Sequence, residues 1–346
     1  AKAFVEEDPD GNGQKDTIGL LCDQRVGGLY NSNHTMDPVF GYYGSYPRQW
    51  LTDESGNVTY GTIAPETKEA LATLRQMYAD KLIDEEFAVR NPNDINAPLA
   101  AGKCGIIFGP WWAAYTLQDS INNDPDADWQ PYLCPLDQNG EFKTYQQEIH
   151  TYWAVVRKDF PHPEALMKLQ SQLSEWLQPV KDLPEGYAYP YRGTPADGKT
   201  IIPLNLQFSE QDYMPKEYAA LNEAEEKKDP GILSDVMVPV YEARLKYKED
   251  PVANRDQWSG YMARTGGYEV ASMENVRVAE NCVFFAMTDS MTARWTSLEK
   301  LENEALLAII TGEKDLDYFD EFVSQWKSLG GDQIMQEATE IIKKQG

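Results

Sequence analysis

Apolar side chains recur at helical spacing along the last third of the chain. One stripe runs through residues 298–308 and stops at Gly312, and a second runs through residues 319–326 and stops before Gly330. A period of about 3.6 residues predicts an amphipathic helix, and glycine is common just beyond a helix end. We therefore expect packed helices here, with a last short one near residues 334–342.

The first half of the chain shows short apolar runs bounded by turn signals. Two of these runs flank the turn of residues 53–57 and predict a β-hairpin. The predicted strands cover residues 17–22, 49–52, 58–60, 104–108, 132–136 and 151–156. Helical spacing follows Pro65 and Pro163, where proline suits a first helical turn. Strands separated by helices indicate an α/β architecture with mixed sheets.

Composition narrows the class of partner. The chain has 346 residues, enough for about two domains, and 56 acidic residues against 31 basic ones give a net charge of -25. Without a basic stripe, such a chain repels phosphate backbones, so we expect no nucleic-acid partner. Aromatic residues make up 12% of the chain, including nine Trp and 20 Tyr. Large, stiff aromatic side chains suit a recognition surface.

The acidic loop near the N-terminus has the spacing of a calcium-binding loop. An EF-hand loop supplies oxygen ligands from positions 1, 3, 5, 7 and 9 and places glycine at position 6. Gly13 occupies position 6, but position 12 is Gly19 instead of the closing glutamate. A loop of Asx turns that needs no metal is the alternative. The predicted ligands are Asp8, Asp10, Asn12, Gln14 through its carbonyl, and Asp16.

The strongest binding candidate is the turn Gly109-Pro110-Trp111-Trp112, which follows a predicted strand. The ends of strands are where α/β folds place ligands. Sugars present apolar faces that stack on indole rings, and their hydroxyls need hydrogen-bonding side chains at the rim. The alternative is that both tryptophans belong to the core. We expect one to be core and one to line a pocket, with Trp111 the better candidate.

Two further segments are candidate ligand contacts. Strand alternation places Glu148 and Tyr152 on one face and Trp153 on the other. An exposed strand face without a ligand explains that pattern equally well. Tyr43 and Arg48 belong to an aromatic cluster with one cation, which is suited to wrapping a ligand. Trp50 lies in the same cluster at the start of the hairpin, and we expect it to serve packing.

Three stretches together carry a family resemblance: the acidic loop at residues 8–16, residues 99–112, and the close of the chain at residues 309–345. The chain resembles the extracellular solute-binding proteins of carbohydrate ABC transporters, in the large lipoprotein branch that includes alginate-oligosaccharide-binding proteins. The resemblance implies a type II periplasmic-binding-protein-like fold, with two lobes of mixed sheets flanked by helices that close on a sugar. It also implies that Trp111 stacks on a sugar ring and that the acidic loop holds a structural calcium ion.

The resemblance also implies a domain organisation. Relatives carry a region before the calcium loop that begins with a signal peptide and a lipidated cysteine, so the first lobe is expected to be incomplete here. Residues 1–147 and 290–346 are assigned to the second, C-terminal lobe with the calcium loop. Residues 148–289 are assigned to the remaining first lobe and the hinge crossings. The expected location is extracellular, either lipid-anchored at the cell surface or periplasmic, with the anchor and signal peptide outside this chain.

The functional hypothesis is a non-catalytic, monomeric receptor that delivers an oligosaccharide to the membrane permease of an ABC transporter. The sequence has no Gly-x-Ser-x-Gly motif and no recognisable nucleophile pair. The alternative is a secreted carbohydrate-active enzyme, a glycosidase or polysaccharide lyase with a structural calcium site. A surface adhesion module is a third possibility.

Overall fold

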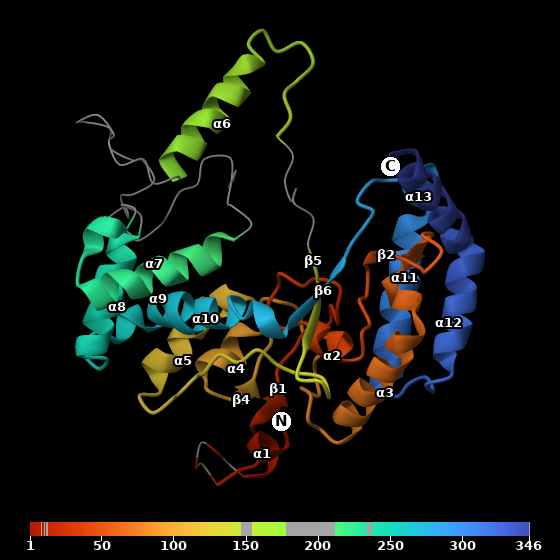
Figure 1. Cartoon of the computed structure of the whole chain (residues 1–346). Coiled ribbons are helices and arrows are strands. Elements are labelled where there is room, and N and C mark those ends of the chain that lie inside the picture. The colour runs from red at the N-terminus through yellow and green to blue at the C-terminus, as the bar shows by residue number, and fades with distance from the viewer. Residues whose placement is uncertain are drawn as a thin grey trace. The chain divides into compact units, whose positions relative to one another are not determined.

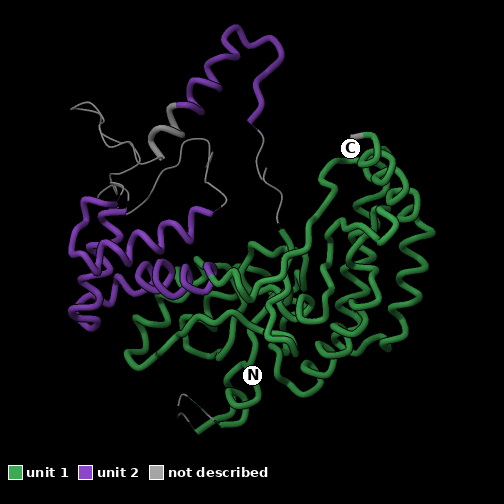
Figure 2. Tube along the Cα trace, viewed as in Figure 1, with its two compact units in different colours: residues 1–148, 273–346 green, residues 149–272 purple. Residues whose placement is uncertain are grey.

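The computed structural model describes residues 1–7, 9, 11, 13–146, 154–177, 212–233 and 237–345. The chain divides into two compact units (Figure 2). Unit 1 comprises Ala1–Glu148 and Met273–Gly346, and unit 2 is the stretch Ile149–Ser272 between them. The assignment of residues 1–147 with 290–346 to one lobe and 148–289 to the other stays a prediction.

Unit 1 combines short strands with helices (Figure 1). Its strands are β1 (Ile18–Leu20), β2 (Trp50–Thr52), β3 (Val58–Tyr60), β4 (Cys104–Ile106), β5 (Phe142–Gln146) and β6 (Arg277–Asn281). Its α-helices are α1 (Lys2–Glu6), α2 (Asp37–Tyr42), α3 (Pro65–Ala79), α4 (Asn96–Ala100), α5 (Gln118–Asn123), α11 (Asp289–Thr311), α12 (Tyr318–Trp326) and α13 (Asp332–Gln345).

Within the described residues of unit 1, the strands form three separate pairs. β1 and β4 are parallel, with Leu20 opposite Ile106. β2 and β3 form the predicted antiparallel hairpin, with Trp50 opposite Tyr60. β5 and β6 are parallel and join the end of the first segment of unit 1 to the start of its second segment. The parallel pair β1–β4 brings the loops that follow both strands to the same edge.

Helices from both ends of the sequence make the core of unit 1. α3 and α11 lie side by side, and α12 packs on α11 (Figure 1). Their apolar positions are buried as the helical spacing predicts, as at Leu74 in α3, Leu298 in α11 and Phe322 in α12. α11 ends at Gly312, whose φ of 83° is the left-handed conformation that favours glycine. Removal of this apolar surface from water is the main stabilising contribution.

Unit 2 is helical in the part that the structure describes. Its helices are α6 (Glu164–Leu177), α7 (Tyr213–Lys227), α8 (Val238–Glu249), α9 (Trp258–Met262) and α10 (Tyr268–Ala271). A small apolar cluster contains Leu221, Leu233 and Tyr241. The Tyr268 hydroxyl donates a hydrogen bond of 2.7 Å to Glu217 and fastens α10 to α7. Among the described residues of the whole chain, no helix has the length and apolar content needed to cross a membrane.

One strand prediction is wrong. Residues 132–136 form no strand, and the pair in this part of unit 1 is β5 with β6 instead. Pro131 and Pro135 flank and interrupt the apolar run, and proline has no N–H to donate to a neighbouring strand. In the predicted partner at residues 151–156, residues 151–153 lie outside the described residues, and residues 154–156 are not in a strand. The other predicted strands and the helices after Pro65 and Pro163 are confirmed.

Candidate ligand-binding site

Two loops meet at the carboxyl edge of the β1–β4 pair. The first covers residues 21–36 and the second covers residues 107–112, and we call them the edge loops. The backbone N–H of His34 donates to the carbonyl of Phe108 over 2.8 Å, and the N–H of Leu21 donates to Ile106 over 3.0 Å. The carboxyl edge of parallel strands is where open α/β sheets bind ligands. The second edge loop carries the sequence-predicted Trp111 and Trp112 at this edge.

Trp111 and Trp112 begin a 3-10 helix, η2 (Trp111–Leu117), directly after the extended Pro110. The buried side of η2 consists of Ala114 and Leu117. Both tryptophans are half-buried, so neither is sealed in the core. The indole N–H of Trp112 donates to Oδ1 of Asn31 over 3.4 Å, which ties η2 to the first edge loop. Each of the two residues thus keeps part of its surface accessible to solvent.

Polar groups surround this turn on the first edge loop. Asp23 is fully buried, and its carboxylate accepts hydrogen bonds from Arg25 Nε over 2.9 Å and from Arg25 Nη2 over 2.5 Å. Arg25 Nη2 also donates to the carbonyl of Asn33 over 3.0 Å. The Asn33 side chain is buried, and its Oδ1 has no hydrogen-bond partner. A Cβ on residue 109 would overlap with this oxygen, so the approach of the two loops requires Gly109.

His34 stays neutral under ordinary conditions. Its ring is buried, and burial lowers its pKa to about 4 because the charged imidazolium loses its hydration. Its φ of 67° is the left-handed conformation, and its Nε2 has no hydrogen-bond partner. The first edge loop therefore offers amides, a compensated Asp23–Arg25 pair and an uncharged imidazole.

Asn31, Asn33 and Arg25 are candidate site residues that the sequence analysis missed. Nothing in their local pattern distinguishes them from ordinary loop residues. They lie near the Trp111–Trp112 turn because β1 and β4 pair in parallel across a long stretch of intervening chain. A turn signal alone does not predict which distant turn will lie beside it.

The side chains of Tyr43 and Arg48 form their hydrogen bonds with core helices of unit 1 and not with the edge loops. The Tyr43 hydroxyl shares a hydrogen bond of 2.5 Å with Thr73 of α3. Arg48 Nε donates to Glu302 Oε1 over 3.0 Å, and Arg48 Nη2 donates to Asn303, both on α11. Glu302 is almost completely buried, and burial raises its pKa, although Arg48 acts in the opposite direction. A ligand-contacting role for Tyr43 and Arg48 stays a prediction.

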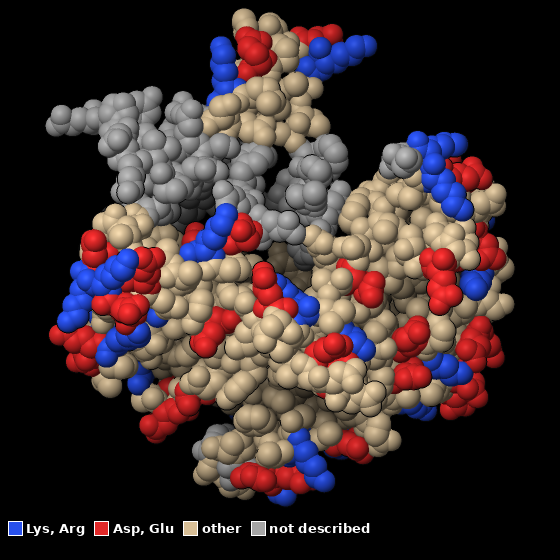
Figure 3. Space-filling view, in the orientation of Figure 1, with Lys and Arg blue, Asp and Glu red and all other residues tan. Residues whose placement is uncertain are grey.

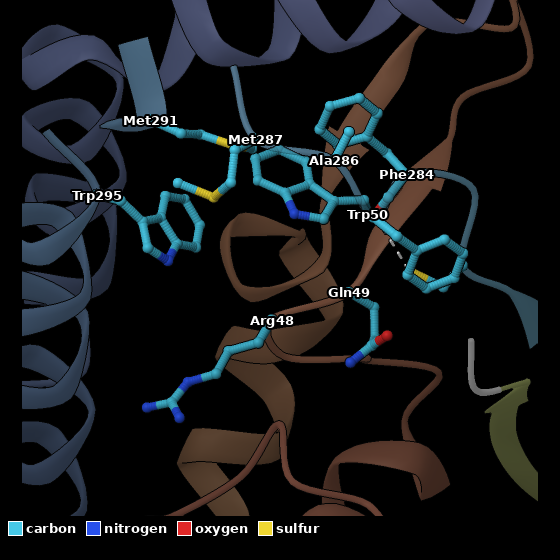
Figure 4. A pocket seen from close by; sticks show the side chains of 10 residues that line it. Arg48, Gln49, Trp50, Phe284, Ala286, Met287, Met291 and Trp295 are labelled. Carbon is cyan, nitrogen blue, oxygen red and sulfur yellow. Dashed lines mark hydrogen bonds between the residues drawn. The ribbon is translucent and has the colours of Figure 1, made fainter. Parts of the chain in front are cut away.

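Arg48 also lines an open cavity of about 280 Å³ at the surface of unit 1 (Figure 4). The cavity lies between the start of the hairpin, the segment that leads from β6 to α11, and α11 itself. The rings of Trp50 and Trp295 are 5.6 Å apart at 38°. Trp50 is buried and packs on Tyr60 as well, so its expected packing role is confirmed, and it also forms part of a cavity wall.

The predicted calcium loop is described in part. Asp8, Asp10 and Asn12 lie outside the described residues. Gly13 has a φ of 80°, the left-handed conformation that the sharp turn at position 6 needs. Asp16 accepts a hydrogen bond from Lys103. The donor set is made of the hard oxygens that calcium prefers, so these residues fit the ion. Glu148, Tyr152 and Trp153 also lie outside the described residues.

Charged side chains of the two signs are interspersed on the face shown in Figure 3. Lys68 lies between Asp317 and Asp320, at 3.0 Å and 2.7 Å. Arg90 pairs with Asp84 and with Glu86. At these two positions the positive charge is compensated by nearby carboxylates.

Comparison with known proteins bears out the resemblance seen in the sequence. No family model matches the chain. The chain is 22% identical over 344 residues to the polygalacturonan/rhamnogalacturonan-binding protein YtcQ and to the lipoprotein LipO, both of Bacillus subtilis (strain 168). The match covers 99% of this chain but 62% of YtcQ and 63% of LipO. The chain thus spans less than two thirds of these relatives.

Solved structures share the fold. The alginate-binding protein AlgQ2, in a form without calcium ion, has a TM-score of 0.58 at 16% identity, over 99% of this chain and 66% of that one. An EF-hand mutant of the Streptococcus pneumoniae ABC-transporter substrate-binding protein FusA, in complex with fructo-nystose, has a TM-score of 0.54 at 15% identity, over 99% and 66%. The predicted fold class, an α/β solute-binding-protein fold, is confirmed.

Proposed function

We propose that this protein is a receptor for an oligosaccharide, which it delivers unchanged to the membrane permease of an ABC transporter. The observation that carries the proposal is the half-buried indole pair Trp111–Trp112 at the carboxyl edge of β1 and β4. Three of the relatives named above, YtcQ, AlgQ2 and FusA, bind polygalacturonan or rhamnogalacturonan, alginate and fructo-nystose, respectively. A likeness to several different glycan receptors supports a carbohydrate ligand and leaves its identity to experiment.

The chemistry of the edge loops suits binding. An indole face stacks on the C–H face of a pyranose, and amides such as Asn31 bond hydroxyl groups at the rim. The indole N–H of Trp112 is already held by Asn31, so the ring is oriented before a ligand arrives. Such preorganisation reduces the entropy lost on binding. Contacts from a second lobe would then make the closed form the more stable one when sugar is present.

The same groups are poorly suited to catalysis. A general acid or base works best when its pKa lies near the working pH. In the edge loops, the pKa of His34 is lowered to about 4, and the carboxylate of Asp23 is occupied by Arg25. The relatives are binding proteins as well. These observations favour a receptor over the glycosidase or lyase alternative.

We further propose a structural calcium ion in the loop of residues 8–16, with Asp8, Asp10, Asn12, Asp16 and the carbonyl of Gln14 as ligands. The left-handed Gly13 and the oxygen-rich donor set support it. The ion would supply charge compensation for three carboxylates and hold the loop that precedes β1. FusA has been studied as an EF-hand mutant, which shows that a loop of this kind occurs among proteins with this fold.

The remaining parts of the proposal concern placement. The likeness to a lipoprotein supports an extracellular position, lipid-anchored at the cell surface or periplasmic. We infer a monomer that meets one oligosaccharide and one permease. Tyr43, Arg48, Glu148, Tyr152 and Trp153 remain proposed ligand contacts, which substitution can test one at a time.

The decisive experiment combines calorimetry with product analysis. The chain is titrated with oligogalacturonates, alginate oligomers and fructans, and the recovered glycan is analysed for new reducing ends. We expect binding of at least one glycan without cleavage, and loss of binding in Trp111→Ala. The matched control is Trp129→Phe, because Trp129 is another half-buried tryptophan of unit 1, held by Ser120 over 3.1 Å. Cleaved glycan, or equal binding in Trp111→Ala and the control, would refute the proposal.

A further inference from the structure

The cavity beside the hairpin has the wall composition of a binding site. Two indoles, Trp50 and Trp295, face it together with Met287 and Phe284 (Figure 4). Its volume of about 280 Å³ is just below the range of drug-sized pockets, which suits a single ring with its substituents. In the view of Figure 4, the flexible side chain of Met287 lies between the two indoles. Methionine adapts its shape readily, so this wall can adjust to an occupant.

One polar group in the cavity wall is available to an occupant. Gln49 as a whole residue is only 7% exposed, it lines the cavity, and its side-chain amide makes no hydrogen bond to the residues that the structure describes. Its backbone N–H is satisfied by Tyr46 over 3.1 Å, so the side-chain amide alone is left. The amide is not among the described side-chain atoms that are sealed from solvent without a partner, so water can reach it from the cavity. A ligand that covered the amide would have to replace this hydration. An occupant with hydroxyl groups would satisfy both its donor and its acceptor.

The charge beside the cavity is already compensated. The guanidinium of Arg48 is directed to α11, where it pairs with Glu302 and Asn303. The second oxygen of Glu302 accepts the Tyr60 hydroxyl over 2.8 Å. The aliphatic stem of Arg48 is left to face the cavity (Figure 4). An occupant that carried its own charge would therefore lose hydration without gaining a free counter-ion.

The cavity opens beside apolar side chains that the fold leaves in solvent. Phe285 is 48% exposed and Met287 is 62% exposed, and both line the cavity. The segment that carries them is fixed at both ends. The N–H of Val283 donates to the carbonyl of Trp50 over 2.8 Å, and Thr288 caps α11 by accepting from Met291 over 3.1 Å. The exposed rim is thus held in place next to the indoles.

From these observations we propose that the cavity lined by Trp50, Trp295 and Gln49 is a binding site for one uncharged pyranose ring. The indoles pack on the apolar face of the ring, and the Gln49 amide bonds two of its hydroxyls. A purely apolar ring would fill the same volume but leave the amide unsatisfied. The site is separate from the Trp111–Trp112 turn, and it does not depend on the receptor function proposed above.

The experiment follows the indole N–H signals of the ¹⁵N-labelled chain by NMR while methyl pyranosides of glucose, galactose and mannose are added. Galacturonate serves as the charged comparison and cyclohexanol as the apolar one. We expect millimolar binding of at least one neutral sugar, with a shift of the Trp295 signal, which is identified by its absence in Trp295→Leu. Gln49→Met keeps the volume and removes the amide, and it should weaken binding about tenfold. Trp129→Phe is the matched control and should bind as the unmodified chain does.

Each other outcome overturns the proposal. Absence of any shift at Trp295 with all three sugars would mean that the cavity is only a packing defect. Equal affinity in Gln49→Met, or tighter binding of cyclohexanol than of every sugar, would mean that the amide selects nothing. Binding that is lost in Trp111→Ala but kept in Trp295→Leu would place the sugar at the edge loops. That last result would support the receptor proposal while refuting this one, so the two can fail separately.

Discussion

Replacing Arg48 with methionine is expected to destabilise unit 1 in a pH-dependent manner. Arg48 is the cation that faces Glu302, at 3.0 Å between Nε and Oε1, and the Glu302 side chain is only 1% exposed. Removing one partner of a buried pair leaves the other charge uncompensated, which costs about 3–5 kcal/mol. Because the Arg48 side chain is 20% exposed, we expect the lower end, about 3 kcal/mol, near neutral pH.

The pH dependence follows from the pKa of Glu302. Burial already raises this pKa, and Arg48 and Tyr60 lower it. Without Arg48 the pKa rises further, so the folded variant binds a proton that the unfolded chain releases at its ordinary pKa of 4.5. The free energy of unfolding of the variant therefore falls as pH rises above that value. The loss relative to the unmodified chain should be small near pH 4.5 and largest above the raised pKa of Glu302.

Urea unfolding measures this loss. Tryptophan fluorescence reports on the same region, because Trp326 stacks on Tyr60 with ring centres 4.9 Å apart. The double variant Arg48→Met, Glu302→Gln should regain most of the stability, since no buried charge remains. Lys68→Met is the control, because its partners Asp317 and Asp320 are exposed, and it should change stability little. A loss in Arg48→Met that is the same at acidic and neutral pH would refute the reasoning.

Three further predictions concern other parts of unit 1. Gly109→Ala should weaken glycan binding and lower the free energy of unfolding by about 1–3 kcal/mol, because the new Cβ would overlap with the Asn33 side chain. Calorimetry measures the binding and urea unfolding measures the stability. Unchanged binding would contradict the loop geometry. Chelation of calcium should lower the melting temperature, because an ion present at 100 times its Kd stabilises the folded chain by about 2.7 kcal/mol. Asp16→Asn should reduce this response. An unchanged melting temperature after chelation would refute the calcium proposal. Burial raises the pKa of Asp37 from 3.8 to about 6, so this group should make the unmodified chain less stable, by about 3 kcal/mol, as pH rises through that interval. Asp37→Asn should lack that component, and identical pH profiles of the two proteins would show that folding does not raise the pKa of this carboxyl.

Local patterns were sufficient for the elements that depend on local forces. The hairpin β2–β3 has its turn residues and apolar runs within a few positions of each other. The stripes of α11 and α12 are periodic over several turns and are bounded by glycines, so their burial could be predicted as well. The binding candidate Trp111 was found in the same way, because a Gly-Pro turn after a strand is a local signal.

Features that depend on long-range pairing were not predictable from those patterns. In the sequence, β5 comes just before unit 2 and β6 comes just after it. No local pattern therefore predicts that these two strands pair. The same holds for the meeting of Trp50 with Trp295, which creates the cavity, and for the approach of Asn31 to Trp112. In each case the contact is set by packing of distant segments, whereas the sequence pattern reports mainly on neighbours.

Because unit 1 consists of two sequence segments, the order of synthesis affects when its core can form. Its core needs both segments, since Tyr60 of the first stacks on Trp326 of the second. On a ribosome, the apolar face of α3 is made long before α11, which must cover it, while unit 2 is a continuous stretch produced in between. Of the two units, unit 1 therefore begins first and is completed last. Until α11 has been synthesised, the apolar face of α3 lacks the helix that covers it in the folded protein.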